Sequence, residues 1–381
     1  MSTGKFFRDG VSYLEMKKIS ILLLLIIVGL ILQRLNPAPK YFFNQNNQLP
    51  RISSSVTPSM TSTSLGYYYK SLFLPSWQLK TSEALKLSGY DRVLFFGLTP
   101  NQTGISQDTA YFFLSSLKNL SLSKGLVIKM INDEINDLVL NNNDVQDNLI
   151  NQTIALAKEN QFSDIALDIE LFSLFPTEKK IQINNFVNKF YARTKENDLK
   201  LSLILYGDTI YRKKIFDLEY LDKYTDEIFI MAYDFHKSGG EPGPNFPLRG
   251  KEKYGYDFQT MIEDYLSFIK ADKITVIFGM YGYQWVVDEQ KRPLKRATAL
   301  TLNNIKDQFI KNCNWQDCVI KRDELSQETE INFINSRVVD GIGRVDYHVI
   351  WFEDEQSVKA KTDYLNTKGI RSTAFWAYGY F

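Results

Sequence analysis

Histidine and cysteine are both scarce in this sequence of 381 residues, with two of each. The histidines, His236 and His348, are far apart and have no ligand-like spacing, which argues against a histidine-based zinc site and against a Ser-His-Asp triad. The sequence also contains no GxGxxG and no GxxxxGK[ST] motif, the glycine-rich patterns that bind nucleotides. These absences argue against a histidine-bound zinc ion and against a nucleotide cofactor.

A charge imbalance is absent as well. The 45 basic residues nearly balance the 44 acidic ones, and the resulting net charge of +1 gives no electrostatic support for a nucleic-acid partner. Aromatic residues, by contrast, make up 14% of the chain. Aromatic rings stack well on the apolar faces of sugars, although most of them fill a core in a chain of this length.

A hydrophobic run lies near the start of the chain. Lys17 and Lys18 precede it, and the run predicts a single transmembrane anchor at 19–35 with residues 1–18 in the cytoplasm and the body of the protein outside the cell. A signal peptide, whose cleavage would release a secreted protein, is the alternative, but no A-x-A-like cleavage site follows. Residues 36–62 are rich in Ser, Thr, Asn and Pro, which predicts a stalk.

The rest of the chain, 63–381, alternates short apolar runs with stretches of helical periodicity. Continuous apolar runs are typical of parallel strands that are covered on both faces. This alternation predicts an α/β fold, a (β/α)8 TIM barrel, with a doubly wound open sheet as the alternative. The predicted strands are 65–69, 93–98, 126–131, 165–169, 201–206, 228–233, 274–280 and 373–377, and the clearest predicted helices are 144–159, 178–196 and 355–368.

The stretch 162–170 reads FSDIALDIE and ends one of these strands with two acids. In a strand Ala166, Asp168 and Glu170 share one face, and the two carboxyl groups are separated by about 7 Å of backbone rise. Because two ionised carboxylates this close repel each other, one of them should hold a proton near neutral pH, as a glycosidase requires of its general acid. A strand end with two solvated acids is the alternative.

Other strand ends also carry polar or aromatic residues. In a TIM barrel the active site lies at the carboxyl ends of the strands, so these side chains should converge on one rim. They are Met231, Tyr233 and Asp234 after the sixth predicted strand, Tyr283 and Trp285 after the seventh, and Trp376 on the eighth.

These residues resemble glycoside hydrolase family 18, which contains chitinases and enzymes of spore germination and peptidoglycan cleavage. FSDIALDIE is similar to the family's D-x-x-D-x-D-x-E signature, and MAYDFH at 231–236 to its M-x-Y-D motif. Three further segments resemble the family in the same order: GGEPGPNFPL at 239–248, FGMYGYQW at 278–285, and WFEDEQSVKAK at 351–361 together with AFWAYGY at 374–380.

The resemblance implies a glycosidase that hydrolyses β-linked N-acetylglucosamine polymers, chitin or peptidoglycan, by a substrate-assisted retaining mechanism that needs no metal or cofactor. It implies Glu170 as general acid and base, Asp168 and Tyr233 as the residues that hold the substrate's acetamido group, and Trp376 as the floor of the central sugar site. The further substrate-binding residues that we expect are Tyr67, Met231, Asp234 and Tyr283, with Trp285 as a platform for a neighbouring sugar. A membrane-tethered lectin that binds glycan without turnover is the alternative function.

Two features depart from the family or extend it. Ala166 stands where the family often has an additional Asp, and Ser163 and Asp164 replace the residues that open the signature. Residues 286–350 are more than a loop needs, and the resemblance implies a small inserted subdomain there. Cys313 and Cys318 fall within it and could form a disulfide if this part is extracellular; a metal pair and two reduced thiols are the alternatives.

Overall fold

The structure, a computed structural model, describes residues 68–381 except for 80–84, 172–177, 312 and 340–341. The described residues all belong to one unit of the chain, Ser64–Phe381. The predicted anchor at 19–35, the predicted stalk at 36–62 and Tyr67 lie outside the described residues. Within the described ranges, no helix has the length and apolar character that crossing a membrane requires.

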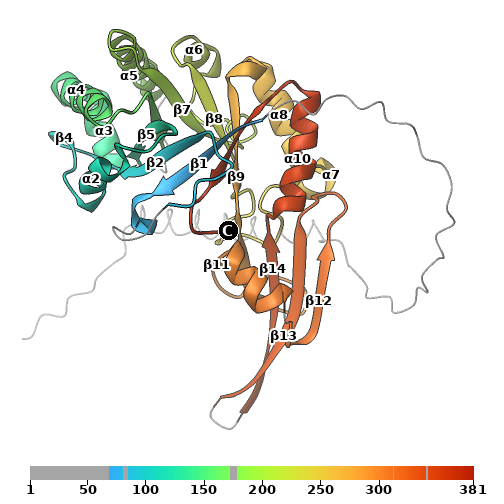
Figure 1. The fold of residues 1–381 in the computed structure, drawn as a ribbon. Coiled ribbons are helices and arrows are strands. Elements are labelled where there is room, and N and C mark those ends of the chain that lie inside the picture. Colours follow the sequence, from blue (N-terminus) through green and yellow to red (C-terminus); the bar gives the residue numbers. More distant parts are fainter. Residues whose placement is uncertain (1–67, 80–84, 172–177, 312, 340–341) are drawn as a thin grey trace, which may run out of the picture. The chain divides into compact units, whose positions relative to one another are not determined.

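Eight parallel strands close into a barrel, which confirms the predicted (β/α)8 architecture (Figure 1). Seven of them match the predicted strands to within a few residues. The first differs: it was predicted at 65–69, whereas the apolar run that pairs with its neighbours on both sides lies further along the chain. Around the ring the strands are β1 (Tyr69–Pro75), β2 (Arg92–Leu98), β5 (Ser123–Met130), β6 (Asp164–Ile169), β7 (Lys200–Tyr206), β8 (Glu227–Ala232), β9 (Ile274–Gly279) and β15 (Ser372–Trp376).

The helices lie outside the ring of strands (Figure 1). The three clearest predictions are confirmed as α4, α5 and α10. Helix α10 begins as expected at Asp354, whose carboxylate accepts hydrogen bonds from the backbone N–H groups of Gln356 and Ser357. The helices of the barrel are α2 (Thr109–Phe113), α3 (Asp133–Asn141), α4 (Asn143–Glu159), α5 (Glu178–Lys195), α6 (Leu218–Lys223), α7 (Lys251–Tyr254), α8 (Phe258–Leu266) and α10 (Glu355–Thr367). Short additional elements are η1 (Ser76–Gln78), β3 (Pro100–Asn101), β4 (Gly104–Ile105), η2 (Leu114–Leu117) and η3 (Ala271–Lys273).

Strand β6 shows how alternation separates the two faces of the barrel wall. Ile165 and Leu167 pack in the large apolar cluster between strands and helices. Ala166 belongs instead to a smaller cluster inside the barrel, together with residues such as Phe73 and Phe229. Since successive side chains of a strand point to opposite faces, Asp168 is directed into the barrel like Ala166.

The amino-terminal end of the barrel interior is filled by a buried ionic network. The Arg92 guanidinium donates two hydrogen bonds to the Glu227 carboxylate, at 2.7 and 2.8 Å, and one to Asp164 at 3.1 Å. The Ser202 hydroxyl also donates to Asp164, at 2.8 Å. A buried charge is tolerated only when it is paired and hydrogen-bonded, and each of these groups meets that condition.

A five-stranded antiparallel sheet lies between β9 and α10, where the sequence predicted an inserted subdomain without specifying its structure. Figure 1 shows its strands in orange and red beside the barrel. The sheet begins at Tyr281 rather than at 286, so Tyr283 and Trp285 belong to its first strand and not to the seventh barrel strand. Cys313 and Cys318 form a disulfide within the insertion. Its elements are β10 (Tyr281–Val287), β11 (Thr298–Thr301), α9 (Leu302–Ile305), η4 (Lys306–Ile310), β12 (Gln316–Arg322), β13 (Thr329–Val339) and β14 (Ile342–Phe352).

Candidate active site

A cavity of about 640 Å³ opens at the carboxyl ends of the barrel strands. This is the end at which TIM-barrel enzymes carry their active sites. Most of the residues predicted from the sequence line this one cavity: Asp168, Glu170, Met231, Tyr233, Asp234, Tyr283 and Trp376. Within the described part of the chain, no group of His, Cys, Asp and Glu side chains is arranged to hold a metal ion.

Asp168 in β6 and Glu170 just after it differ in their surroundings. The backbone N–H of Glu170 donates to the Met130 carbonyl at 2.9 Å, which continues the β5–β6 pairing, and its half-buried carboxylate accepts a hydrogen bond from the Tyr206 hydroxyl at 3.0 Å. Asp168 is only 3% exposed, and its Oδ1 atom has no hydrogen-bond partner among the described residues. A buried oxygen without a partner is available to a donor from a ligand.

Both carboxyl groups have raised pKa values. Burial raises the pKa of Asp168 well above its usual range, the Glu170 charge raises it further, and Lys129 opposes the shift. Burial also raises the pKa of Glu170, against the hydrogen bond from Tyr206 and the charges of two lysines, Lys237 and Lys214. The pair therefore retains a proton at a higher pH than two isolated carboxyl groups would.

Tyr233 directly follows β8 and faces the same cavity. Burial, and then the charges of Asp168 and Glu170, raise the pKa of Tyr233 well above its usual value, so its hydroxyl stays a hydrogen-bond donor. Gly279 makes room for it, because a Cβ atom at that glycine would lie 2.7 Å from the Tyr233 Cβ. The end of β9 can therefore approach Tyr233 only with a glycine at this position.

Asp234 is held in a left-handed backbone conformation, with φ of 58°, which Asp tolerates better than most residues. Its backbone N–H donates to the side-chain oxygen of Asn245 at 2.8 Å. Its carboxylate accepts hydrogen bonds from the Tyr281 hydroxyl and, at 2.8 Å, from the Tyr283 hydroxyl. Two tyrosines of strand β10 in the insertion thus fix the Asp234 side chain at the cavity.

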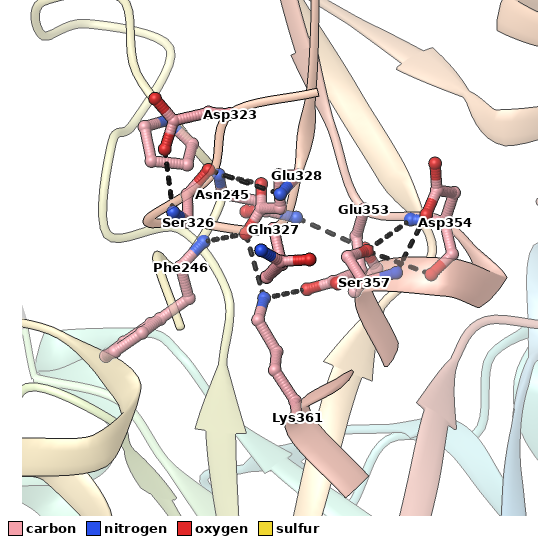
Figure 2. Close-up of polar contacts among 12 residues, drawn as sticks. Asn245, Phe246, Asp323, Ser326, Gln327, Glu328, Glu353, Asp354, Ser357 and Lys361 are labelled. Carbon is pink, nitrogen blue, oxygen red and sulfur yellow. Dashed lines mark hydrogen bonds and ion pairs between the residues drawn. The ribbon is translucent and has the colours of Figure 1, made fainter. Parts of the chain in front are cut away.

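A second connection between insertion and cavity is the buried ionic cluster of Glu328, Glu353 and Lys361 in Figure 2. The Glu328 carboxylate accepts the backbone N–H of Asn245 at 2.6 Å and that of Phe246 at 2.8 Å. It also accepts a hydrogen bond from Lys361 at 2.8 Å, and Lys361 donates to Glu353 as well. Because the Asn245 side chain binds Asp234, this cluster anchors the loop that supports the cavity.

Aromatic rings form one wall of the cavity around Trp376. Its ring centroid lies 4.7 Å from that of Phe96, 5.6 Å from that of Phe73 and 6.3 Å from that of Trp77. Trp77 is 53% exposed, an unusual state for a tryptophan in contact with other rings. A wall of this kind suits the apolar face of a sugar.

The expectation that Trp285 is a sugar platform is wrong. Its side chain is completely buried in a small apolar cluster with Val287, Val349 and Trp351, so no sugar can stack on it. Its indole N–H donates to the Gly240 carbonyl at 3.0 Å. Trp285 therefore packs the inserted sheet and holds the loop after β8.

Sequence reasoning missed Tyr206, Lys129, Trp77 and Phe96, which all line the cavity. Tyr206 is the last residue of β7, and Lys129 is the next-to-last residue of β5. A polar residue that ends an apolar strand was the signal that identified Asp168, and the same signal would have found these two. Trp77 and Phe96 carry no such signal, because aromatic residues are common throughout the chain.

Comparison with known proteins agrees with this geometry. The family model described as "Glycosyl hydrolases family 18" matches residues 77–380. The chain is 25% identical over 246 residues to a putative sporulation-specific glycosylase, YdhD, of Bacillus subtilis, covering 64% of this chain and 53% of that protein. It is 23% identical over 280 residues to a cortical fragment-lytic enzyme of the same organism, covering 70% of this chain and 60% of that protein.

The chain thus spans little more than half the length of these two relatives. Among solved structures, the spore cortex-lytic enzyme SleL of Bacillus cereus has a similar fold, with a TM-score of 0.64 at 18% identity, covering 83% of this chain and 72% of that one. The family match extends over most of the barrel and the insertion, including every cavity residue named above except Phe73. The chain therefore belongs to the glycosyl hydrolases family 18.

Proposed function

We propose that the chain is a membrane-anchored glycosidase that hydrolyses β-linked polymers containing N-acetylglucosamine, with Glu170 as its general acid and base. The observation that carries this proposal is the position of Glu170. Its carboxylate lies at the carboxyl end of β6, beside the buried Asp168, and lines the cavity whose wall contains Trp376. It accepts a hydrogen bond from the Tyr206 hydroxyl at 3.0 Å. A carboxylic acid with a raised pKa in such a cavity is suited to proton transfer near neutral pH.

The proposed reaction is retaining and uses the substrate's own acetamido group. In the first step Glu170 gives its proton to the glycosidic oxygen while the acetamido carbonyl oxygen attacks the anomeric carbon. The bond between the anomeric carbon and the glycosidic oxygen breaks, the leaving sugar departs with a free hydroxyl group, and an oxazolinium ion remains. Asp168 accepts a hydrogen bond from the acetamido N–H, and Tyr233 donates one to the carbonyl oxygen. In the second step the Glu170 carboxylate takes a proton from water, whose oxygen bonds to the anomeric carbon and opens the oxazolinium ring.

The unpartnered Oδ1 atom of Asp168 supports the role of that residue, since an acetamido N–H would satisfy it. For the sugar itself, we propose Trp376 as the floor, with Met231, Asp234 and Tyr283 around it, all of which line the cavity. Tyr67 keeps its proposed role on the resemblance alone.

Peptidoglycan is the substrate that we place first, ahead of chitin. The two relatives described above are named as a sporulation-specific glycosylase and a cortical fragment-lytic enzyme, and the first of these names refers to sporulation. A membrane anchor would also place the cavity near a cell wall. Chitin contains the same N-acetylglucosamine unit, and the cavity residues named above do not distinguish the two polymers.

The membrane location is a separate part of the proposal. It depends on the apolar run at 19–35 and its flanking lysines. Fractionation of cells that express the full chain should place it in the membrane pellet, and protease added to intact cells should cleave the body. Release of a shortened, soluble protein into the medium would instead favour the cleaved signal peptide.

A substrate panel tests the function. The purified full chain, in detergent, is incubated with chitin oligomers and with purified peptidoglycan, and new reducing ends are identified. The proposal expects products that end in N-acetylglucosamine, and early NMR spectra that show the β-anomer. Binding to both polymers without new reducing ends would support the lectin alternative, and an α-anomer as first product would contradict retention.

A further inference from the structure

Lys129 is a cation on the inner face of the barrel wall, at the mouth of the cavity. It lies two residues beyond Val127, which belongs to the interior apolar cluster, so its side chain has the same inward direction. Its ammonium nitrogen lies 5.7 Å from the ring centroid of Trp77 and 5.6 Å from that of Phe96. These two rings thus hold the Lys129 ammonium group at the cavity, and Lys129 is one of the residues that line it.

The neighbour of Lys129 on the next strand is Asp168. The two residues are direct partners in the parallel β5–β6 register, and both face the cavity. No hydrogen bond or ion pair with a carboxylate holds Lys129 elsewhere in the described ranges, whereas Lys214, on the Glu170 side, lies 2.9 Å from the Asp208 carboxylate. The charge of Lys129 therefore acts on the cavity without a fixed counterion.

Asp168 needs such a cation to stay ionised. It is almost completely buried, and the residue one layer deeper on the same face of β6 is Ala166, which offers no hydrogen bond. The titratable groups that act on Asp168, in addition to Lys129, are Glu170 just after the same strand, Tyr206 at the end of β7 and Tyr233 just after β8. Glu170 disfavours a charge on Asp168, and Lys129 is the cation among these groups.

We propose that Lys129 is a positioning residue of this active site, whose ammonium group favours the ionised form of the Asp168 carboxylate and so shifts the proton of the acid pair toward Glu170. Only this distribution leaves Asp168 as an acceptor for the acetamido N–H and Glu170 as a proton donor. The opposing influence of Lys129 on the raised pKa of Asp168 agrees with this role. The kinetic consequences rest on the proposed glycosidase function.

The two limbs of the pH profile report the two protonation steps of the coupled acid pair, and the proposal assigns the acid limb to Asp168 and the basic limb to Glu170. At low pH the pair takes up a second proton on Asp168, and at high pH it loses the proton of Glu170. Lys129→Met removes the charge beside Asp168, so its pKa rises and the acid limb moves to higher pH, by roughly 0.5 to 1 pH unit for a charge in a partly solvated cleft. Lys129→Arg keeps the charge and should keep the limb near its wild-type position.

Lys237→Met is the matched control, because Lys237 lines the same cavity but lowers the pKa of Glu170. It should move the basic limb upward and leave the acid limb in place. The assay uses the full chain in detergent and an uncharged fluorogenic N-acetylglucosamine oligomer. Because this substrate carries no charge, a contact between Lys129 and an anionic substrate cannot produce the shift of the acid limb. Circular dichroism melting checks that each variant is folded, and Lys129→Gln serves as a second neutral variant.

A carboxyl NMR titration of aspartate-labelled full chain gives a readout that does not require turnover. The Asp168 resonance is identified by its loss in Asp168→Asn, and its titration midpoint should rise when Lys129 is replaced by Met. A midpoint and an acid limb that both match the wild type would overturn the inference. If the wild-type chain shows no turnover, the proposed function fails, while the NMR midpoint still decides the role of Lys129.

Discussion

The Tyr206 hydroxyl donates a hydrogen bond of 3.0 Å to the Glu170 carboxylate, across the adjacent strands β6 and β7. This contact lowers the pKa of Glu170, while burial raises it. The pKa of Glu170 therefore depends on two opposing effects, and removal of the Tyr206 hydroxyl oxygen would abolish one of them.

Tyr206→Phe removes that oxygen and keeps the ring. The pKa of Glu170 should rise, so the basic limb of the pH profile should move to higher pH, and kcat should fall roughly tenfold because a charge-assisted hydrogen bond is lost. Tyr220→Phe is the control. It removes a hydroxyl that accepts a hydrogen bond from Asn188 on the outer helices, and it should leave the pH profile unchanged. Identical profiles for the wild type and both variants would show that the Tyr206 contact is without influence on Glu170.

The two tryptophans Trp285 and Trp376 should respond differently to truncation. Trp285→Ala should lower the free energy of unfolding by about 3–5 kcal/mol, because it empties a buried apolar cluster. Trp376→Ala should mainly weaken binding of N-acetylglucosamine oligomers, by roughly tenfold to a hundredfold, through loss of a stacking surface. Urea denaturation and oligomer titration on both variants test this, and weaker binding by a fully stable Trp285→Ala protein would restore the sugar platform predicted from the sequence.

Lys361 is fully buried between Glu328 and Glu353. Lys361→Met leaves two buried carboxyl groups without their cation and should lower the free energy of unfolding by about 3–5 kcal/mol. Lys359→Met is the control on the same helix, since Lys359 forms an exposed pair with Asp363 and should change stability by less than about 1 kcal/mol. Equal denaturation midpoints for the two variants would show that the buried cluster does not stabilise the fold.

Glu353 in the same cluster gives stability a pH dependence. Burial raises its pKa to about 8, from a usual value of 4.5, although Lys361 opposes the shift. The folded chain therefore holds a proton that the unfolded chain has already released, so the free energy of unfolding should fall as pH rises from about 5 to about 8, by at most about 1.4 kcal/mol per pH unit from this group.

Urea denaturation over this pH range tests the slope. Glu353→Gln, which cannot ionise, should flatten it, whereas Glu355→Gln alters an exposed acid on the first turn of α10 and should not. A slope that is unchanged in Glu353→Gln would mean that Glu353 is ionised in the folded protein throughout.

Much of the barrel could be predicted because its strands are continuous apolar runs, which are typical of a sheet covered on both faces. The face of Asp168 and Glu170 followed from the period of two residues along β6. The first strand was misplaced because Leu65 and the tyrosines after it resemble a strand as closely as the true run does. Sequence periodicity does not reveal which of two neighbouring apolar segments finds a partner on each side.

The burial of Trp285 and the proposed role of Lys129 beside Asp168 could not be predicted for a different reason. Both depend on contacts between segments far apart in the sequence or on neighbouring strands. Trp285 is buried only because β10 pairs with β14 and packs against the loop at Gly240. Lys129 gains its position only from the register that places it beside Asp168.

The most direct test of the account is the rate of Glu170→Gln on an N-acetylglucosamine oligomer, measured beside the wild-type chain. We predict a loss of about 10² to 10⁴-fold in kcat, the usual contribution of a general acid, with oligomer binding retained. The loss should be smaller for a fluorogenic substrate whose leaving group needs little protonation. A Glu170→Gln protein that cleaves the oligomer at the wild-type rate would contradict the central role of Glu170.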